Sequence, residues 1–346
     1  MKKLGNTLKI ISGLVLSGVF LYLAFRKIQF SEMRQAFTRA NYLFLVPAIL
    51  VMFISHWLRS LRWQYFLKPI KRISIRNLFS ALMIGYMGNS ILPAHLGEFF
   101  RAYVIGRKEK ISASSVLATI VVERIVDIFS LLVIMAITLI MYPFPSWVKK
   151  SGYIMLICSI GLFIFLILLK KNISKTMTFV RKILNIFPQK VAFKVEGIIY
   201  AFLDGVKRLE NKGDYFVVLV YSILIWTCYW LFLHINFYTF GLFQSYQVNA
   251  LSSLVLLVIT TISVVVPSSP GYVGTYHFLC QFSLGLFGVP RSVGLTFAIV
   301  AHAVIILPVV LVGLFFTWRE GIDLMRLSRR KELSESTNFT HLCDGS

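Results

Sequence analysis

The feature that most constrains this 346-residue chain is a series of apolar runs, each long enough to cross a lipid bilayer as a helix. A bilayer core requires roughly 17–25 apolar residues per helical span. Six runs have a suitable length, at residues 8–25, 42–58, 112–142, 152–169, 215–240 and 291–318. Only 14% of the residues are charged, against about one-quarter in a soluble domain. The sequence therefore predicts an all-α integral membrane protein.

Two further apolar regions differ from these spans because proline and glycine interrupt them. The first, residues 77–106, is broken around Pro93, and the second, residues 250–288, is broken around Pro267 and Pro270. Proline removes a backbone donor and disfavours helical geometry in the residue before it. Each region is therefore expected to form two half-helices around a turn, as a re-entrant hairpin that returns to the side it left.

The distribution of Lys and Arg predicts the orientation. If both hairpins return to their starting side, one side of the membrane holds 28 of the 36 Lys and Arg, the other side holds 7, and one lies within a span. Cytoplasmic segments carry the excess of basic residues. We therefore expect a multi-pass protein of the inner or plasma membrane with both termini in the cytoplasm. Its basic segments are the N-terminus and residues 59–76, 101–110, 170–212 and 319–331.

The same topology contains a repeat within a predicted transmembrane domain at residues 1–318. The halves, residues 8–142 and 152–318, each run span, span, hairpin, span, and they enter the membrane from opposite sides. Inverted repeats with interrupted helices are typical of secondary transporters; the alternative is a coincidence of loop charge and proline placement. Residues 172–212 are expected to lie along the cytoplasmic headgroups as amphipathic helices. A basic, then polar, cytoplasmic tail is predicted at residues 319–346.

The net charge of +22 would suggest a nucleic-acid partner in a soluble protein. Here the basic residues lie between apolar runs, so we interpret them as topology signals and as contacts to anionic membrane lipids. No nucleic-acid partner is predicted. The four cysteines are scattered and have neither metal-ligand nor redox spacing. No metal site or cofactor is therefore predicted, and the oligomeric state is left open.

Five ionisable residues are predicted to meet inside the first half. Glu98 and Arg101 are three residues apart in the first hairpin, and Glu123, Arg124 and Asp127 share a face of the next span. Each such group costs about 2.5–3.5 kcal/mol at membrane depth. They should therefore face one another or a wet cavity, with Arg101 packed against Glu123 or Asp127. Three acids and two cations leave one acid without a partner.

Two readings of this charge cluster stay open. It is either a structural network of ion pairs that locks the broken helix to the bundle, or a polar site for a charged headgroup or a proton. Asn89 and Pro93 are expected to shape the adjacent break, where unwound backbone groups need partners. Together with the five charged residues, they form the first part of the predicted substrate-binding site.

The second hairpin supplies the other part of that site and carries no formal charge apart from a possible charge on His277. Backbone amides at the start of a half-helix, where the helix dipole is positive, suit a phosphate. The alternative is a turn that only packs the bundle. The residues predicted to bind substrate here are Ser268, Ser269, Pro270, Gly271, Gly274 and Thr275.

These motifs resemble a known family. The pattern is Asn89, Pro93-Ala94, Gly97-Glu98 and Arg101-Ala102, then Glu123-Arg124 and Asp127, then residues 270–275. Taken in this order, over roughly residues 8–318, it is similar to the lysylphosphatidylglycerol synthase transmembrane, or flippase-like, family. In its best-known members this module moves an aminoacylated phospholipid between leaflets, and a separate soluble domain makes that lipid. The family often has Gly-Gly and a later Glu in the last motif, where this chain has Tyr272 and His277.

The resemblance implies translocation or transport of an amphipathic, phosphate-bearing lipid. No synthase domain follows residue 318, so the chain is not expected to be an enzyme. Two alternatives remain: a membrane scaffold or accessory partner of a lipid-modifying synthase, and an enzyme acting on a lipid-linked substrate. The second would need Glu123 and Asp127 to be freed from arginine, because the sequence offers no nucleophile–base pair or metal cluster.

Overall fold

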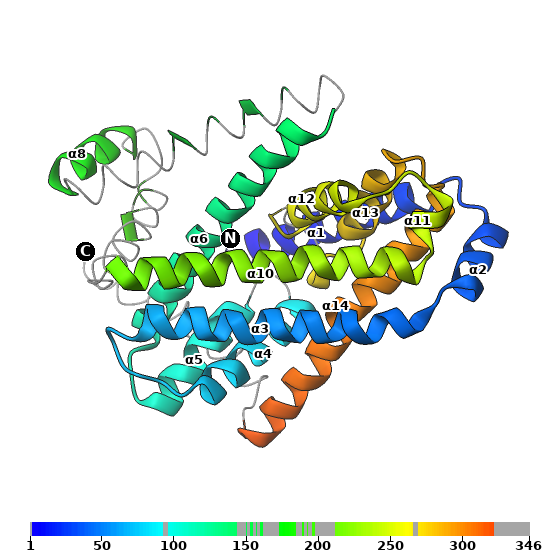
Figure 1. Cartoon of the computed structure of the whole chain (residues 1–346). Coiled ribbons are helices and arrows are strands. Elements are labelled where there is room, and N and C mark those ends of the chain that lie inside the picture. Colours follow the sequence, from blue (N-terminus) through cyan, green and yellow to red (C-terminus); the bar gives the residue numbers. More distant parts are fainter. Residues whose placement is uncertain are drawn as a thin grey trace.

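The computed structural model describes residues 2–92, 96–143, 173–184, 212–265 and 269–321, with isolated positions between 150 and 197. Within these ranges every regular element is a helix (Figure 1). The predicted all-α class is confirmed. The predicted span at residues 152–169, apart from isolated positions, and the tail beyond residue 321 lie outside the described residues.

Long apolar helices confirm the membrane-spanning character. These helices are α3 (Leu45–Leu67), which directly follows η1 (Tyr42–Phe44), and α6 (Ala113–Met141), α10 (Lys212–Thr239) and α14 (Arg291–Arg319). Each of these four is long and apolar enough to cross a membrane. α1 (Lys2–Phe25) corresponds to the predicted first span and contributes a shorter apolar stretch, Val15–Phe25.

The first interrupted region forms the predicted hairpin, with α4 (Ile75–Ile91) and α5 (Gly97–Glu109) packed side by side. Glycines permit this close approach. A Cβ on Gly97 would collide with the carbonyl oxygen of Gly85, and a Cβ on Gly88 would lie 2.9 Å from the Cα of Gly97. Small residues at a helix contact let two backbones approach and gain van der Waals packing.

The second interrupted region forms α12 (Ala250–Val265) and α13 (Thr275–Gly285), with η2 (Pro270–Tyr272) before α13. Its turn uses positive φ angles at Gly271 (66°), Tyr272 (59°) and Gly274 (90°). Ser17 of α1 secures this turn, because its hydroxyl donates to the Val273 carbonyl (2.6 Å) and accepts from the Ser269 amide (3.1 Å).

The two hairpins open toward opposite ends of the bundle. At one end, Lys68 pairs with Asp214 (3.0 Å), which joins the end of α3 to the start of α10. At the same end, Asn77 at the start of α4 donates to Glu109 at the end of α5 (2.8 Å). Both ends of the first hairpin therefore lie where α3 ends and α10 begins, because Lys71, just after α3, also pairs with Glu109 (2.8 Å).

At the other end, the backbone amide of Asn41, before α3, donates to the Thr239 carbonyl at the end of α10 (2.8 Å). Trp230 of α10 donates to the Ala250 carbonyl at the start of α12 (3.0 Å). Gln281 of α13 donates to the Arg291 carbonyl at the start of α14 (3.0 Å). The second hairpin therefore opens at this end, as an inverted topology requires.

The tips of the two hairpins meet inside the bundle. A Cβ on Gly271 would lie 3.3 Å from the carbonyl oxygen of Ser90 near the end of α4. An imidazole nitrogen of His302, on α14, lies 2.8 Å from the Gly271 carbonyl. The break in each interrupted helix thus lies against the break in the other, within protein, where non-helical backbone at membrane depth is tolerated.

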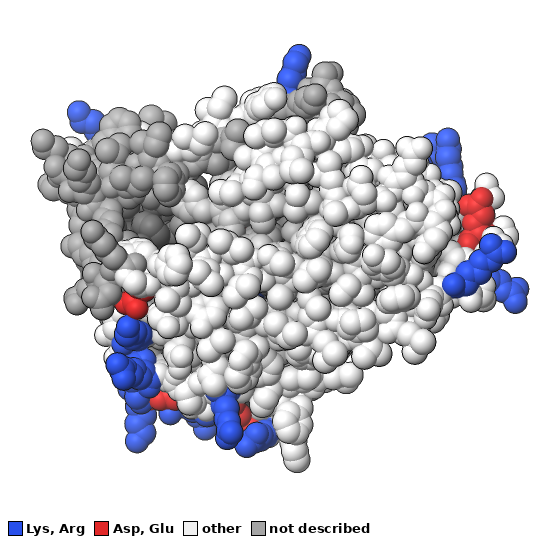
Figure 2. All heavy atoms as spheres, in the orientation of Figure 1, with Lys and Arg blue, Asp and Glu red and all other residues white. Residues whose placement is uncertain are grey.

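Charge on the molecular surface follows the same two ends. Figure 2 shows Lys and Arg gathered at opposite ends of the visible face, with uncharged residues between them. One basic group lies over α2 (Phe30–Arg39), an amphipathic helix between α1 and α3. Within residues 172–212 the structure describes α8 (Ile173–Leu184) and isolated positions after it, and α8 buries Met177, Val180 and Leu184.

One boundary prediction is wrong, with consequences for the site. The predicted second span stops at residue 58, but α3 continues to Leu67 and carries Arg59 and Arg62 into the protein interior. The sequence alone predicts both arginines in a cytoplasmic segment, because charge normally ends an apolar span. Here acidic side chains of α6 neutralise them, so the helix continues.

Candidate functional site

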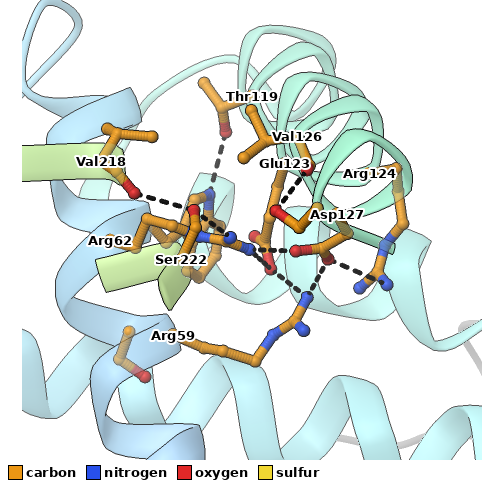
Figure 3. Close-up of polar contacts among 12 residues, drawn as sticks. Arg59, Arg62, Thr119, Glu123, Arg124, Val126, Asp127, Val218 and Ser222 are labelled. Carbon is orange, nitrogen blue, oxygen red and sulfur yellow. Dashed lines mark hydrogen bonds and ion pairs between the residues drawn. The ribbon is translucent and has the colours of Figure 1, made fainter. Parts of the chain in front are cut away.

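Helices α3, α5 and α6 bring charged side chains together beside α10 (Figure 3). Arg59 of α3 bridges two acids of α6, with Nη2 lying 2.6 Å from a carboxylate oxygen of Glu123 and 2.6 Å from one of Asp127. Arg62 donates to the other oxygen of Asp127 (2.6 Å). Arg101 of α5 donates to the other oxygen of Glu123 (2.7 Å).

The centre of this cluster is inaccessible to solvent. The side chains of Glu123 and Arg62 are 0% exposed, that of Arg101 is 3% exposed and that of Arg59 is 5% exposed. Buried charges persist only with partners and further hydrogen bonds. Ser222 and Tyr229 of α10 supply such bonds to Arg62 and Arg59, at 2.9 Å each.

Arg101 is held by an aromatic ring as well as by its carboxylate partner. Its guanidinium lies 3.5 Å from the centroid of the Trp63 ring, a cation–π contact. Trp63 in turn donates to the Thr119 hydroxyl of α6 (2.9 Å). The predicted packing of Arg101 against Glu123 is confirmed.

The edge of the cluster is accessible. Arg124 pairs with Glu98 of α5 at 2.9 Å, and their side chains are 35% and 29% exposed. Arg124 also lies 3.6 Å from Asp127, the (i, i+3) pairing that the sequence suggested. Figure 3 shows Arg62 and Arg124 on opposite sides of Asp127, so the cluster runs from a buried side to an open one.

The charge of this cluster has the opposite sign to the one predicted from the sequence. The prediction of one acid without a cation is wrong, because Arg59 and Arg62 bring the group to four arginines and three acids, a net charge of +1. Glu98 pairs with Arg124 in place of Arg101. A signal for the missed arginines exists, since apolar residues continue beyond them at positions 61, 63 and 65–67.

Asn89 lies at the first break, as predicted, and its side chain closes the gap between the half-helices. Its carboxamide oxygen accepts a hydrogen bond (2.8 Å) from the backbone amide of Gly97, which is the first residue of α5. That bond satisfies one of the free amides at a helix N-terminus. Pro93 lies outside the described residues.

The family follows from comparison with known proteins. A family model described as the lysylphosphatidylglycerol synthase TM region matches residues 10–313. The chain belongs to this family. It is similar to a UPF0104 membrane protein of Methanocaldococcus jannaschii, with 25% identity over 313 residues that cover 86% of this chain and 91% of the relative.

Two further similarities are informative about this family member. A UPF0104 membrane protein of Methanothermobacter thermautotrophicus is 21% identical over 295 residues, which cover 79% of this chain and 84% of that protein. Glycosyltransferase AglD of Haloferax volcanii is 29% identical over 123 residues, which cover 35% of this chain but only 20% of that protein. No solved structure matches.

In this family member the hydroxyl groups of the second hairpin shape the turn. Ser269 donates to the Val273 carbonyl (3.1 Å), and Thr275 donates to the Tyr272 carbonyl (3.0 Å). Tyr272 adopts the left-handed conformation that glycine adopts without strain. Ser268 lies outside the described residues.

Three aromatic side chains lie behind this turn. The rings of Tyr276 and His302 stack at 4.6 Å, and His277 meets His302 edge-on at 4.8 Å. The Gly274 amide donates to the His277 ring (3.3 Å). Within the described residues, no group of His, Cys, Asp or Glu has the arrangement of a metal site.

Proposed function

We propose that this protein moves an amphipathic, phosphate-bearing lipid across the membrane. The observation that carries the proposal is the partly exposed Arg124–Glu98 pair at the edge of a buried cluster with an excess of positive charge. Arginine presents a planar set of donors that suits phosphate oxygens. An anionic headgroup that reaches this edge can replace the Glu98 carboxylate beside Arg124.

The position of this pair favours transport over simple lipid adhesion. Glu98 follows Gly97, whose amide binds the Asn89 side chain at the first break. The carbonyl of the residue after Asn89, Ser90, lies against Gly271 at the tip of the second hairpin. The accessible edge therefore adjoins the junction of two hairpins that open to opposite ends of the bundle. In secondary transporters, substrate sites lie at such repeat interfaces, formed by discontinuous helices near the bilayer midplane.

Catalysis on a lipid is the less favoured alternative. Glu123 and Asp127, the acids that would serve as a catalytic pair, both bind arginines. An acid held in such pairs is a poor general base or nucleophile, because accepting a proton or forming a bond breaks a stabilising contact. The buried part of the cluster thus supports the structural role, and the Arg124–Glu98 edge supports substrate binding.

Transport is tested with purified protein in liposomes that contain trace fluorescent lipids with phosphatidylglycerol, phosphatidic acid or phosphatidylcholine headgroups. Loss of fluorescence to an impermeant quencher measures exchange between leaflets. Vesicles with the wild-type protein should exchange anionic lipids between leaflets faster than protein-free vesicles do. The Arg124→Gln variant should lower this protein-dependent exchange rate at least tenfold. Lys68→Gln removes one positive charge from an exposed pair and serves as the matched control.

The outcomes separate the three classes of function. If no labelled lipid exchanges between leaflets faster than in protein-free vesicles, the result contradicts transport. Conversion of a lipid to a new chemical species identifies an enzyme. If neither exchange nor conversion occurs, the scaffold role beside a lipid-modifying synthase becomes the better proposal.

We further propose that the end of the bundle joined by the Lys68–Asp214 pair faces the cytoplasm, with both termini on that side. The excess of basic residues in the segments assigned to that side supports this orientation. Fusions of a reporter active only in the cytoplasm should be active at either terminus. An inactive C-terminal fusion beside an active N-terminal one would contradict the returning hairpins.

A further inference from the structure

A second polar site lies at the end of the bundle where the first hairpin opens. A cavity of about 750 Å³ is formed between α3, α4, α5 and α14, a size within the usual range for small-molecule sites. Its lining includes four basic residues: Arg76, Arg107, Lys108 and Arg319. Glu320 is the acid among its lining residues, so these charged side chains carry a net charge of +3.

The single acid is already engaged. Glu320 pairs with Lys108 (2.8 Å) and accepts a hydrogen bond from the buried Ser80 hydroxyl (2.6 Å). Among the described residues, no ion pair engages Arg76, Arg107 or Arg319. Three guanidinium groups around one cavity are thus available to an anion.

The helix dipoles explain part of this charge but not all of it. Arg107 and Arg319 lie in the last turns of α5 and α14, where a cation is favoured. Arg76, by contrast, lies in the first turn of α4, where the dipole disfavours a cation. Since this arginine faces the same cavity as the others, an anionic ligand offers the physical reason for its position.

The other wall of the cavity is aromatic. The ring of Phe79 lies 5.6 Å from that of Trp57 and 6.1 Å from that of Phe316. Trp57 is 42% exposed. This row runs from the basic residues toward the apolar surface, which suits a molecule with a charged head and an apolar chain better than a free anion.

We propose that this cavity binds the phosphate of a membrane phospholipid through Arg76, Arg107 and Arg319, with the first part of an acyl chain along Trp57, Phe79 and Phe316. It is a site separate from the Arg124–Glu98 edge. Under the proposed function, it holds the lipid at the surface before the lipid reaches the cluster. Arg107 lies six positions after Arg101 on α5, which places the two residues about 9 Å apart along the helix axis.

Binding is measured with a fluorescent short-chain phosphatidic acid and the full-length protein in detergent. The double variant Arg107→Gln/Arg319→Gln should bind at least tenfold more weakly than wild type. The control, Arg34→Gln/Arg39→Gln, removes the same charge from exposed positions of α2 at the other end of the bundle. Equal weakening in both double variants would show a general charge effect and overturn the site.

Competition distinguishes a lipid from a free phosphate. Inorganic phosphate or glycerol phosphate should displace the probe at least a hundredfold less effectively than unlabelled short-chain phosphatidic acid. Phe79→Ala should weaken the binding of the lipid and leave the binding of glycerol phosphate unchanged. Displacement by inorganic phosphate at similar concentrations would identify an anion site without a lipid role.

A wild-type experiment keeps the proposal testable if a variant fails to fold. A phospholipid with a photoreactive group near the start of one acyl chain is incorporated in nanodiscs with the intact protein. Crosslinked peptides should map to α3, α4 or α14 around Trp57, Phe79 and Phe316. If crosslinks form only at other residues, this site is overturned. If crosslinks form at this site but the protein shows no leaflet exchange in liposomes, only the transport proposal is overturned.

Discussion

The two hairpins share an architecture but not a chemistry. The first, α4–α5, contributes Glu98 and Arg101 to a cluster of four arginines and three acids, and its arms are held together by glycine contacts and by Asn89. The second, α12–α13, turns on serine, threonine and backbone carbonyls, with stacked Tyr276 and His302 behind it. One hairpin is therefore fixed by charge and the other by neutral hydrogen bonds.

This difference suggests that the two hairpins have different roles where their tips meet. A charged group recognises an anionic headgroup and rejects others, because exchanging one ion pair for another preserves the charge balance. Neutral hydrogen bonds are individually worth only about 0.5–1.5 kcal/mol, so a turn held by them can rearrange at modest cost. Under the proposed transport function, the first hairpin would supply selectivity and the second would supply the movable element.

The largest effect is expected at Glu123, which holds both Arg59 and Arg101. Glu123→Gln leaves buried Arg101 without its carboxylate partner and Arg59 with Asp127 alone, and breaking such a buried pair typically costs about 3–5 kcal/mol. The variant should give little folded protein and a much lower unfolding temperature in detergent. Thermal scans by intrinsic fluorescence and size-exclusion profiles measure both quantities.

Asp214→Asn is the matched control for that variant. It also removes one acid from an ion pair, but its partner Lys68 has a side chain that is 40% exposed. Exposed pairs contribute about 0–1 kcal/mol. If Asp214→Asn and Glu123→Gln shift the unfolding temperature equally, the first hairpin is not fixed by its buried charges, and the contrast between the hairpins fails.

A smaller effect, about 1–3 kcal/mol, is expected where the arms of the first hairpin touch. Gly97→Ala places a methyl group against the Gly85 carbonyl and the Asn89 side chain, so the arms must separate. In the second hairpin, the Cβ of Gly285→Ala meets nothing within 4 Å. That variant should be neutral or slightly stabilising, because alanine favours a helix more than glycine does.

Unfolding temperatures of the two alanine variants test this difference in packing. Gly97→Ala should also lose leaflet exchange, since separation of α5 from α4 moves Glu98 away from Arg124. Equal temperatures for Gly97→Ala and Gly285→Ala would contradict the close approach of α4 and α5.

Local signals in the sequence predicted most of the architecture. The span predicted at residues 112–142 appears as α6, Ala113–Met141, and both breaks lie where proline and glycine predicted them. Periodicity, helix breakers and the cost of buried charge act over a few residues, so a single sequence reveals them. The pairing of Arg101 with Glu123 was also predictable, because few cations lie near enough to neutralise that acid.

The missed features depend on contacts between distant segments. Arg59 and Arg62 resemble the start of a loop until α6 supplies acids more than sixty residues later. Glu98 pairs with Arg124 because Glu123 already holds Arg101. The basic cavity combines residues of α3 and α14 that are about 260 positions apart, so its existence depends on the tertiary fold.

The smallest expected effect concerns Tyr272, at the tip of the neutral hairpin. Its φ of 59° lies in the left-handed region, which costs a residue other than glycine about 1–2 kcal/mol. Tyr272→Gly relieves this strain but loses ring contacts and adds freedom to the unfolded chain, so the net change should stay within about 1 kcal/mol. Tyr272→Val retains the strain and adds a β-branched side chain, which should lower the unfolding temperature further.

Tyr238 provides the control that gives this prediction its sign. It lies on α10 in ordinary helical backbone and is 43% exposed. In helical backbone glycine is less favourable than valine, so Tyr238→Gly, in the last turn of α10, should be less stable than Tyr238→Val, the reverse of the order at Tyr272. The same order at both positions would show that the conformation of residue 272 is unstrained. The neutral hairpin would then lack the stored strain that makes its turn the readier of the two to rearrange.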